Sequence, residues 1–437
     1  MTARLAALLA LFAAAAAQPA AAQPAAAQTA AGQTAGPVLS CRLETDAPAE
    51  QPVPAERRSA GRPAACPASE RTAVFAVEYV GFPNDARAAF QAAIDVWSCR
   101  IASRVPIRIL ARWEGLAPTT LGSAGPFLVR NTDGLPLRDT WYPTALANAV
   151  AGRDLAPDDP DILGSFNRDF AGWHLDPATP PPGDRYDLAT VVLHEIGHGL
   201  GFIGALAVVD GLGYVGAPGR TRGPYAYDRF TEARGVPLLD ARAFPDGSAA
   251  LADALRSGDV AFDGPAVRQA TAAPAPLYAP PAWDEGASYS HLDERSYVPA
   301  TPDGLMTPFL ARGEAVAEPG TATCAVLADV GWTLAGDCAA RVGTRPDTRG
   351  GLTAERTGPN PASRQTSIRV TSATSARLVA TLVDALGRRV AVLADVPAEA
   401  GAPVDVRVPV LGLASGVYRV VVTAGADRAV VPVVVVR

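Results

Sequence analysis

Several residue types and patterns are scarce in this 437-residue chain, and each shortage excludes a class of protein. Lysine is absent, so all 38 basic residues are arginine, and 44 acidic residues leave a net charge of −6. Such a chain lacks the basic excess with which proteins bind nucleic acid or anionic lipid. The apolar stretch from Leu5 to Ala17 is too short for a membrane span of about 20 residues, and no later stretch qualifies.

The N-terminal apolar stretch has the features of a secretory signal. Arg4 precedes it, and small residues suited to cleavage follow it, for example after Ala22. We therefore expect residues 1–22 to be a signal peptide and the mature protein to be secreted or held at the cell surface. Residues 23–70 repeat Ala, Gln and Pro and then become rich in Pro, Ala and charge, so we expect them to form a flexible leader or propeptide.

Cysteine is limited to five residues, which in an exported protein favour disulfides over metal ligation. Cys324 and Cys338 enclose a short loop, and a bond between them would stabilise the fold by about 3 kcal/mol in the chain-entropy model. Cys41, Cys66 and Cys99 can form at most one further bond. The odd cysteine is then either a buried thiol or, if it lies in the leader, a metal ligand that holds the protein inactive.

Histidine is limited to four residues, yet two of them stand in the segment VVLHEIGHGLGFIG, residues 191–204. His194 and His198 are four apart, so on a helix their imidazoles share one face and can converge on one metal ion. A chance HExxH is expected in about one in a thousand chains of this composition. The helix is predicted to begin at an Asp187 cap and to end at Gly199 and Gly201.

Two imidazoles on one helix suit zinc, which lowers the pKa of a bound water from about 15.7 to about 7. Glu195 lies on the flank of the same helix face, where its carboxylate can reach that water without ligating the metal. Glu195 is therefore predicted to be a general base for hydrolysis near neutral pH.

The extended pattern HExxHxxG, completed by Gly201, resembles the metzincin zinc peptidases, whose chain turns sharply at this glycine to bring in a third ligand. Their usual third histidine would fall at Gly204, which has no side chain. The leishmanolysin-like branch instead inserts a long segment before a histidine that shortly precedes a methionine in a tight turn beneath the metal. His291 in SYSHLDERSY and Met306 in GLMTP are similar to that branch. The likeness spans roughly residues 71–334 and also includes DVGW near residue 330.

This resemblance implies that His291 is the third zinc ligand and that Met306 forms the Met-turn. Catalytic zinc usually takes three protein ligands and one water. Four other residues remain candidates for the third position: His174, Glu232, Asp293 and Glu294. A carboxylate there would suggest the thermolysin-like set of two histidines and a glutamate.

The order of expected elements predicts an α+β catalytic domain over residues 71–340, with a twisted sheet and the zinc-binding helix. Strands are expected at 72–80, 105–113 and 161–169, and helices at 85–101, 248–255 and 321–329. Residues 161–169 are expected to form the sheet edge beside the cleft, where metzincins pair with extended substrate. Residues 211–281 are expected to build one cleft wall mainly from loops.

The C-terminal segment, residues 360–437, follows a linker at 341–359 and consists of six short β-rich runs, typical of a small all-β sandwich. Its segments NPAS, VDALGRRV and LASGVYRV resemble the C-terminal sorting domain recognised by the type IX secretion system. A generic fibronectin-like module that binds a surface glycan is the alternative. Histidine and cysteine are absent from it, so we expect no catalysis there.

Together these features predict a secreted zinc metalloendopeptidase that hydrolyses peptide bonds with a metal-activated water and a glutamate base. Its partners would be a protein or peptide substrate and, by resemblance, the type IX secretion machinery. A zinc hydrolase of a non-peptide amide is one alternative. A surface binding or adhesion protein with a structural metal is the other, but structural zinc sites are closed and need no base such as Glu195.

Overall fold

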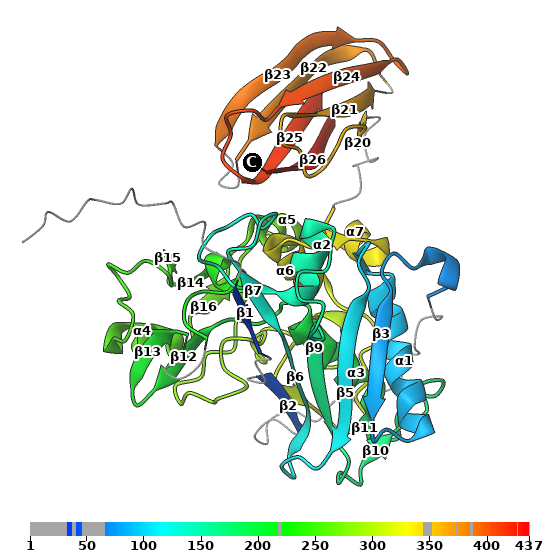
Figure 1. Cartoon of the computed structure of the whole chain (residues 1–437), viewed down its shortest axis with the longest axis vertical. Coiled ribbons are helices and arrows are strands. Elements are labelled where there is room, and N and C mark those ends of the chain that lie inside the picture. The colour runs from blue at the N-terminus through cyan, green and yellow to red at the C-terminus, as the bar shows by residue number, and fades with distance from the viewer. Residues whose placement is uncertain are drawn as a thin grey trace, which may run out of the picture. The chain divides into compact units, whose positions relative to one another are not determined.

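The computed structural model describes residues 33–36, 41–45, 66–216, 221–343, 352–372, 374–384, 388–425 and 427–436. The predicted signal peptide, most of the leader and part of the linker lie outside these ranges. The described elements confirm an α+β chain (Figure 1). Within these ranges no helix is both long and apolar enough to cross a bilayer.

The main sheet of residues 41–343 has six strands in the order β18, β2, β6, β9, β5, β3. Strands β3, β5 and β9 run parallel, whereas β6 is antiparallel to β9, and β2 is antiparallel to β6. Their bounds are β18 (Phe309–Leu310), β2 (Cys41–Thr45), β6 (Thr120–Pro126), β9 (Ile162–Asn167), β5 (Ile107–Glu114) and β3 (Phe75–Val80).

Two helices pack against this sheet and against each other, α1 (Asn84–Ser98) and α3 (Leu188–Gly199). The amphipathic pattern of α1 buries Phe90, Ile94 and Trp97, as its apolar spacing predicts. The Trp97 indole N–H donates to the carbonyl of Leu193 at 3.0 Å. This bond and the apolar contacts between α1 and α3 fix the position of α3 on the sheet.

The prediction that residues 161–169 form the edge of the sheet is wrong. Strand β9 lies between β6 and β5, and all six of its residues are buried, as expected for an internal strand. Between β9 and the leader strand β2 lies β6, which the sequence did not indicate. Its sequence is TLGSAGP, and glycine and proline are weak strand formers. Gly122 of β6 is explained by packing, because a Cβ there would lie 3.0 Å from Val191 and 3.2 Å from Glu195 of α3.

The prediction of a flexible leader fails for two short stretches. Gln33–Ala35 forms β1, which pairs antiparallel with β7 (Leu128–Arg130), and Cys41–Thr45 forms β2 of the main sheet. Leader residues therefore run antiparallel to the β6 and β7 segments of the chain. Figure 1 shows both leader strands in dark blue, with β1 beside β7 and β2 beside β6.

The segment after α3 is more regular than the predicted loop wall. It contains the hairpin β12 (Leu206–Val209) and β13 (Leu212–Val215), and a small sheet in the order β15, β14, β16, β17. The remaining elements of this segment are β14 (Thr231–Ala233), β15 (Val236–Pro237), α4 (Ala249–Leu255), β16 (Val260–Phe262), α5 (Pro265–Thr271) and β17 (Ala275–Pro276).

Smaller elements complete residues 66–343. The helices are α2 (Thr144–Ala151), α6 (Thr321–Val330) and α7 (Gly336–Arg341), with short 3-10 turns at Ala68–Glu70, Tyr227–Phe230 and Pro302–Gly304. The strands are β4 (Ile101–Ala102), β8 (Tyr142–Pro143), β10 (Trp173–His174), β11 (Tyr186–Asp187) and β19 (Thr333–Leu334).

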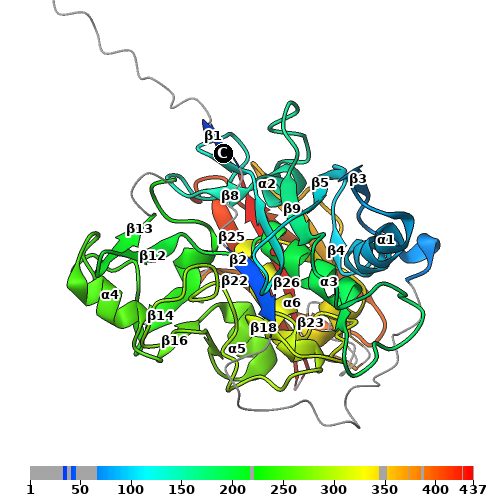
Figure 2. The ribbon, with the colours of Figure 1, turned by 90° about the horizontal axis from the view of Figure 1, so that it is seen from below.

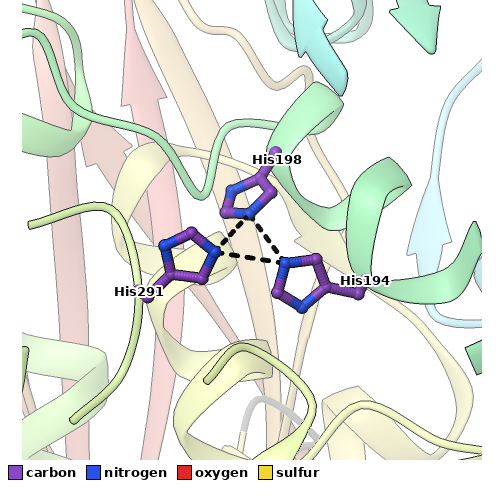
Figure 3. A group of neighbouring side chains, drawn as sticks. All are labelled: His194, His198 and His291. Carbon is purple, nitrogen blue, oxygen red and sulfur yellow. Dashed lines mark hydrogen bonds between the residues drawn. The ribbon is translucent and has the colours of Figure 1, made fainter. Parts of the chain in front are cut away.

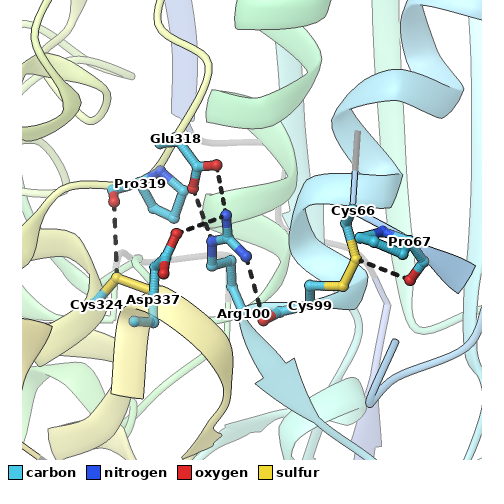
Figure 4. A network of polar contacts seen from close by, with 9 residues as sticks. Cys66, Pro67, Cys99, Arg100, Glu318, Pro319, Cys324 and Asp337 are labelled. Carbon is cyan, nitrogen blue, oxygen red and sulfur yellow. Dashed lines mark hydrogen bonds and ion pairs between the residues drawn. A yellow bond between two sulfur atoms is a disulfide. The ribbon is translucent and has the colours of Figure 1, made fainter. Parts of the chain in front are cut away.

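Two disulfides stabilise this part of the chain. Cys324 and Cys338 are bonded as predicted, joining α6 to α7, and Cys66 is bonded to Cys99 at the end of α1. Figure 4 shows Arg100 between the two disulfides, where its guanidinium donates to both carboxylate oxygens of Glu318 at 2.7 and 2.5 Å. The odd cysteine is Cys41, which is buried in β2.

The C-terminal residues form two antiparallel sheets around one apolar core, the predicted sandwich. One sheet contains β20 (Leu352–Arg356), β21 (Gln365–Ser372) and β24 (Pro403–Pro409). The other contains β23 (Arg389–Ala398), β22 (Ala376–Val383), β25 (Gly416–Ala424) and β26 (Asp427–Val435). Strand β20 falls inside the predicted linker, so the boundary at 359 is too late. Its alternate residues Leu352 and Ala354 are buried, which places β20 in the sandwich.

Candidate metal centre

Helix α3 forms where the sequence predicts it, because its N-cap, its apolar positions and its terminating glycines all indicate the same helix. The Asp187 carboxylate accepts from the backbone N–H of Thr190 at 2.9 Å, the bond of an N-cap. The helix ends at Gly199, and Gly201 has φ +117°, a conformation that residues with a Cβ rarely adopt. All twelve helical residues are buried, so the side chains of α3 point into the protein.

Three imidazoles converge at the C-terminal half of α3 (Figure 3). His194 and His198 come from successive turns of the helix, and His291 comes from the segment after β17. Their Nε2 atoms are 3.0, 3.1 and 3.2 Å apart, and all three side chains are fully buried. The structure thus brings together the residues that the sequence proposed as metal ligands.

The hydrogen bonds of the three Nδ1 atoms determine whether the Nε2 atoms carry a proton or a lone pair. Each Nδ1 contacts a backbone carbonyl: His194 that of Leu305 at 2.6 Å, His198 that of Phe202 at 2.7 Å, and His291 that of Ala287 at 2.7 Å. A carbonyl only accepts, so each Nδ1 carries the proton. In the neutral rings each Nε2 then presents a lone pair to the other two.

Burial keeps the three rings neutral. It lowers the pKa of His194 to about 4 and holds the pKa values of His198 and His291 well below their usual range. Three lone pairs about 3 Å apart repel one another unless a cation lies among them. The donor set therefore fits a metal ion that prefers imidazole nitrogen, and backbone carbonyls orient all three rings for it.

The rival third ligands lie elsewhere. His174 in β10 lies at the surface, where its Nε2 contacts the carbonyl of Thr179 at 2.9 Å. Neither Glu232 nor the carboxylates of Asp293 and Glu294 belong to the histidine group. Within the described ranges, His194, His198 and His291 are the one group of potential ligands that converges in this way.

Glu195 is fully buried beside the histidines on α3, where its carboxylate faces β2 and β6. Its Oε1 accepts from the backbone N–H of Leu43 at 3.1 Å, whereas Oε2 has no hydrogen-bond partner among the described residues. Burial raises the pKa of Glu195 well above its usual range, and the backbone amides of Leu43 and Ala124 only partly offset that rise. The side chain is thus a buried carboxyl with high proton affinity.

Met306 packs directly against α3. A Cβ at Gly197, between His194 and His198 in the sequence, would lie 2.8 Å from the Met306 sulfur. The residue before Met306 supplies the carbonyl for His194, and the Met306 carbonyl accepts from the Leu292 N–H at 2.8 Å. The Met306 turn therefore links the helix to the segment that carries His291.

A buried polar cluster that the sequence did not indicate fixes the His291 segment from the other side. The Asp228 carboxylate accepts from the Tyr289 hydroxyl at 2.7 Å and from the backbone N–H of Ala205 at 3.1 Å. The Ser290 hydroxyl accepts from the Gly204 N–H at 3.1 Å. Asp228 and Tyr289 occupy the space that a side chain at position 204 would need. Besides a local bond from the Tyr225 N–H, Asp228 bonds to residues 23 and 61 positions away, and the sequence gives no signal of these distant contacts.

Two comparisons with known proteins identify no relative of this chain. A scan against known protein families finds no match, and a search of curated proteins finds none.

Proposed function

We propose that this protein is a zinc-dependent endopeptidase whose residues 66–343 form a metzincin-like catalytic domain. One observation carries the proposal: three buried histidines present converging Nε2 lone pairs beside Glu195, a buried carboxyl with one unpartnered oxygen. The order of parts along the chain supports it, because the glycine turn, the third histidine and the methionine turn follow the helix as in the leishmanolysin-like branch.

Zinc is the metal that the donor set favours. Zinc lies about 2.0–2.1 Å from histidine nitrogen, so two such donors of a tetrahedral ion are about 3.3–3.4 Å apart. The observed Nε2 separations of 3.0 to 3.2 Å are close to this spacing. Three protein ligands also match the usual catalytic set, which keeps one position for water or substrate.

When bound, zinc polarises a carbonyl and generates a hydroxide-like nucleophile near neutral pH. Glu195 supplies the proton transfers. Its high proton affinity, caused by burial, suits a carboxylate that removes a proton from the attacking water and then donates it to the leaving amine. Oε2 makes no hydrogen bond among the described residues and can take that proton.

A peptide is the substrate class that the surroundings favour. Strand β6 passes beside Glu195, and its backbone edge on the side away from β9 pairs with the extended strand β2, so this edge accommodates an extended chain. A hydrolase of small amides would not need such an edge. A purely structural metal is disfavoured, because a closed structural site needs no base, whereas Glu195 is buried beside the histidines although burying a carboxyl without a partner at Oε2 is costly.

Export is also part of the proposal. Two disulfides indicate folding in an oxidising compartment, which agrees with a secreted or cell-surface protein. We propose that the C-terminal sandwich serves export, because its sequence resembles type IX sorting domains. Its apolar core is separate from that of residues 66–343, so it need not contribute to the site.

Replacing Glu195 with Gln tests the proposed function. The variant should bind zinc with wild-type stoichiometry and lose about 10²–10⁴-fold in peptide hydrolysis, because the amide cannot accept the proton. Metal analysis and a fluorogenic peptide assay on the same samples measure both quantities. A chelator should abolish wild-type hydrolysis and added zinc should restore it. Wild-type turnover by Glu195→Gln would exclude Glu195 as the base.

A further inference from the structure

The chain between α3 and His291 is a long insert whose two ends meet at one carboxylate. Its elements β12, β13, β14, β16 and α4 lie together, in green in Figure 2, on the side of the domain opposite α1. Asp228 lies within this insert, 23 residues after Ala205 and 61 residues before Tyr289. It bonds to both of these residues, so a single side chain joins the start of the insert to its end.

The Asp228 carboxylate acts only as an acceptor. Its Oδ1 accepts from the Tyr289 hydroxyl at 2.7 Å, and its Oδ2 accepts from the Tyr225 N–H at 2.7 Å. The Ala205 N–H lies 3.1 Å from both oxygens. All three partners donate, which favours the ionised form, and bonds to a charged acceptor are roughly twice as strong as bonds between neutral groups. The side chain is buried, so solvent does not compete for these bonds.

Tyr289 holds its end of this contact in a backbone conformation that is unfavourable for tyrosine. Its φ is +73°, in the left-handed region that a residue with a large ring rarely adopts. Such a conformation persists only where surrounding contacts hold it. The hydroxyl bonds to Asp228, the Thr231 hydroxyl lies 2.8 Å from the same oxygen, and the buried ring packs edge to face against Tyr227. The side chain of Tyr289 therefore holds its own strained backbone.

Both ends of the insert lead directly to metal-ligand candidates. Tyr289 stands two residues before His291, so its backbone conformation sets the direction in which the chain continues to that ring. Ala205 stands three residues after Phe202, whose carbonyl orients His198 through Nδ1 at 2.7 Å. One carboxylate is thus bonded to the chain beside a ligand from α3 and to the chain beside the ligand from the insert.

We propose that Asp228 is a positioning residue for the metal centre: by bonding to Tyr289 and Ala205 it holds the strained backbone that directs His291 toward the two histidines of α3. The insert then does more than separate the ligands, because it is closed on itself by Asp228 and so delivers its last residues to the helix. A side chain at position 204 could not take this role, since its Cβ would overlap the Tyr289 ring. Of the proposed function, this inference uses metal binding and not peptide hydrolysis.

The test compares the full-chain variants Tyr289→Phe and Tyr142→Phe. Tyr289→Phe removes the hydroxyl that bonds to Asp228 and keeps the ring. Tyr142 is also buried, and its hydroxyl accepts from the Leu137 N–H at 3.1 Å, outside the histidine group, so Tyr142→Phe is the matched control. Competition with a chromogenic chelator measures zinc affinity, and the visible spectrum of the cobalt(II)-loaded protein reports ligand geometry. Denaturant titration of the metal-free protein measures stability separately.

A second pair of variants removes the other partner of the bond. Asp228→Ala takes away the carboxylate, and Asp161→Ala is its control, because Asp161 is equally buried and bonds to the Arg108 N–H and the Asn148 amide. Since Asp228→Ala and Tyr289→Phe break the same bond, their effects on zinc affinity should not add. The double variant should bind zinc as Asp228→Ala does.

We expect Tyr289→Phe to weaken zinc binding by about tenfold or more and to change the cobalt spectrum, because a bond to a charged group no longer holds the strained backbone. Asp228→Ala should weaken zinc binding at least as much. Tyr142→Phe and Asp161→Ala should keep wild-type affinity and spectrum, whatever their stability. A merely structural Asp228 would lower stability in the denaturant titration and leave both metal readouts unchanged.

Wild-type zinc affinity or a wild-type cobalt spectrum in folded Tyr289→Phe would overturn the proposal, and so would an equal loss in Tyr142→Phe. If Asp228→Ala does not fold, Tyr289→Phe and its control decide the question. A wild-type chain that binds neither metal would overturn the positioning role together with the zinc centre. A wild-type chain that binds zinc and hydrolyses no peptide would count against the endopeptidase function alone.

Discussion

Removing the third imidazole, by His291→Ala, is the sharpest test of the metal centre. His291 supplies one of three buried Nε2 donors, and its ring is oriented by the Ala287 carbonyl at 2.7 Å. Apparent zinc-binding free energies of about 10–16 kcal/mol for four-ligand sites correspond to about 3 kcal/mol for each ligand. We therefore expect His291→Ala to weaken zinc binding by about 10²-fold or more and to abolish measurable peptide hydrolysis.

His174→Ala is the matched control for this prediction. His174 is partly exposed, and its ring Nε2 contacts the carbonyl and hydroxyl of Thr179. Its removal should leave zinc affinity and hydrolysis within about twofold of wild type. Competition titration against a chromogenic zinc chelator measures affinity for both variants, and the peptide assay follows on the same samples. The reasoning is refuted if His291→Ala keeps wild-type affinity, or if His174→Ala is the variant that loses it.

Three further predictions concern stability and domain roles. Gly204→Ala should lower the free energy of unfolding by about 2 kcal/mol, because its Cβ would overlap the Tyr289 ring and lie 2.5 Å from Asp228 Oδ1; wild-type stability in a denaturant titration would contradict this. Burial raises the pKa of Asp161 to about 6, so the folded state binds its proton more tightly than the unfolded state, and the stabilisation present at low pH is lost as pH rises. The free energy of unfolding of wild type relative to Asp161→Asn should therefore fall by about 3 kcal/mol between pH 3.5 and 6.5, and a flat difference would contradict the raised pKa. A chain ending at Gly343 should keep its hydrolysis rate per bound zinc but fail to be exported, and loss of hydrolysis in a folded, zinc-loaded protein would show that the sandwich contributes to the site.

Sequence patterns correctly predict those helices, strands and disulfides whose defining residues lie close together in the chain. Helix α3 was readable because its cap at Asp187, its apolar positions and its terminating glycines fall within fifteen residues. The helix α1 and the six predicted sandwich strands were readable from their periodicity, apart from shifts of a few residues at their ends. The Cys324–Cys338 bond was readable because its loop is short.

Weak or distant signals were misread for physical reasons. Strand β6 is not predicted from the sequence because it has few of the β-branched residues that mark a strand; Gly122, for example, stands where a Cβ would crowd α3. The sequence predicts β9 as an edge strand because β6, which lies beside it in the sheet, is not predicted. Strand β2 is short and lies within a Pro- and Ala-rich leader, so only its partners β6 and β18 define it. Strand β20 was assigned to a linker because its surroundings are rich in Arg, Gly and Thr.

The sequence by itself determined the residue types of the candidate site: two histidines one helical turn apart, a carboxyl between them, and a small set of candidates for the third ligand. These features follow from the 3.6-residue helical period, which acts over a few residues. The tertiary structure alone decided which candidate joins them and what covers them. His291 reaches the helix across 93 residues because the Met306 turn and the Asp228 cluster hold its segment there. Leu43 reaches Glu195 across 152 residues because a strand edge beside α3 accepts β2. Contacts over such separations depend on how sheets and helices pack, and no local pattern encodes them.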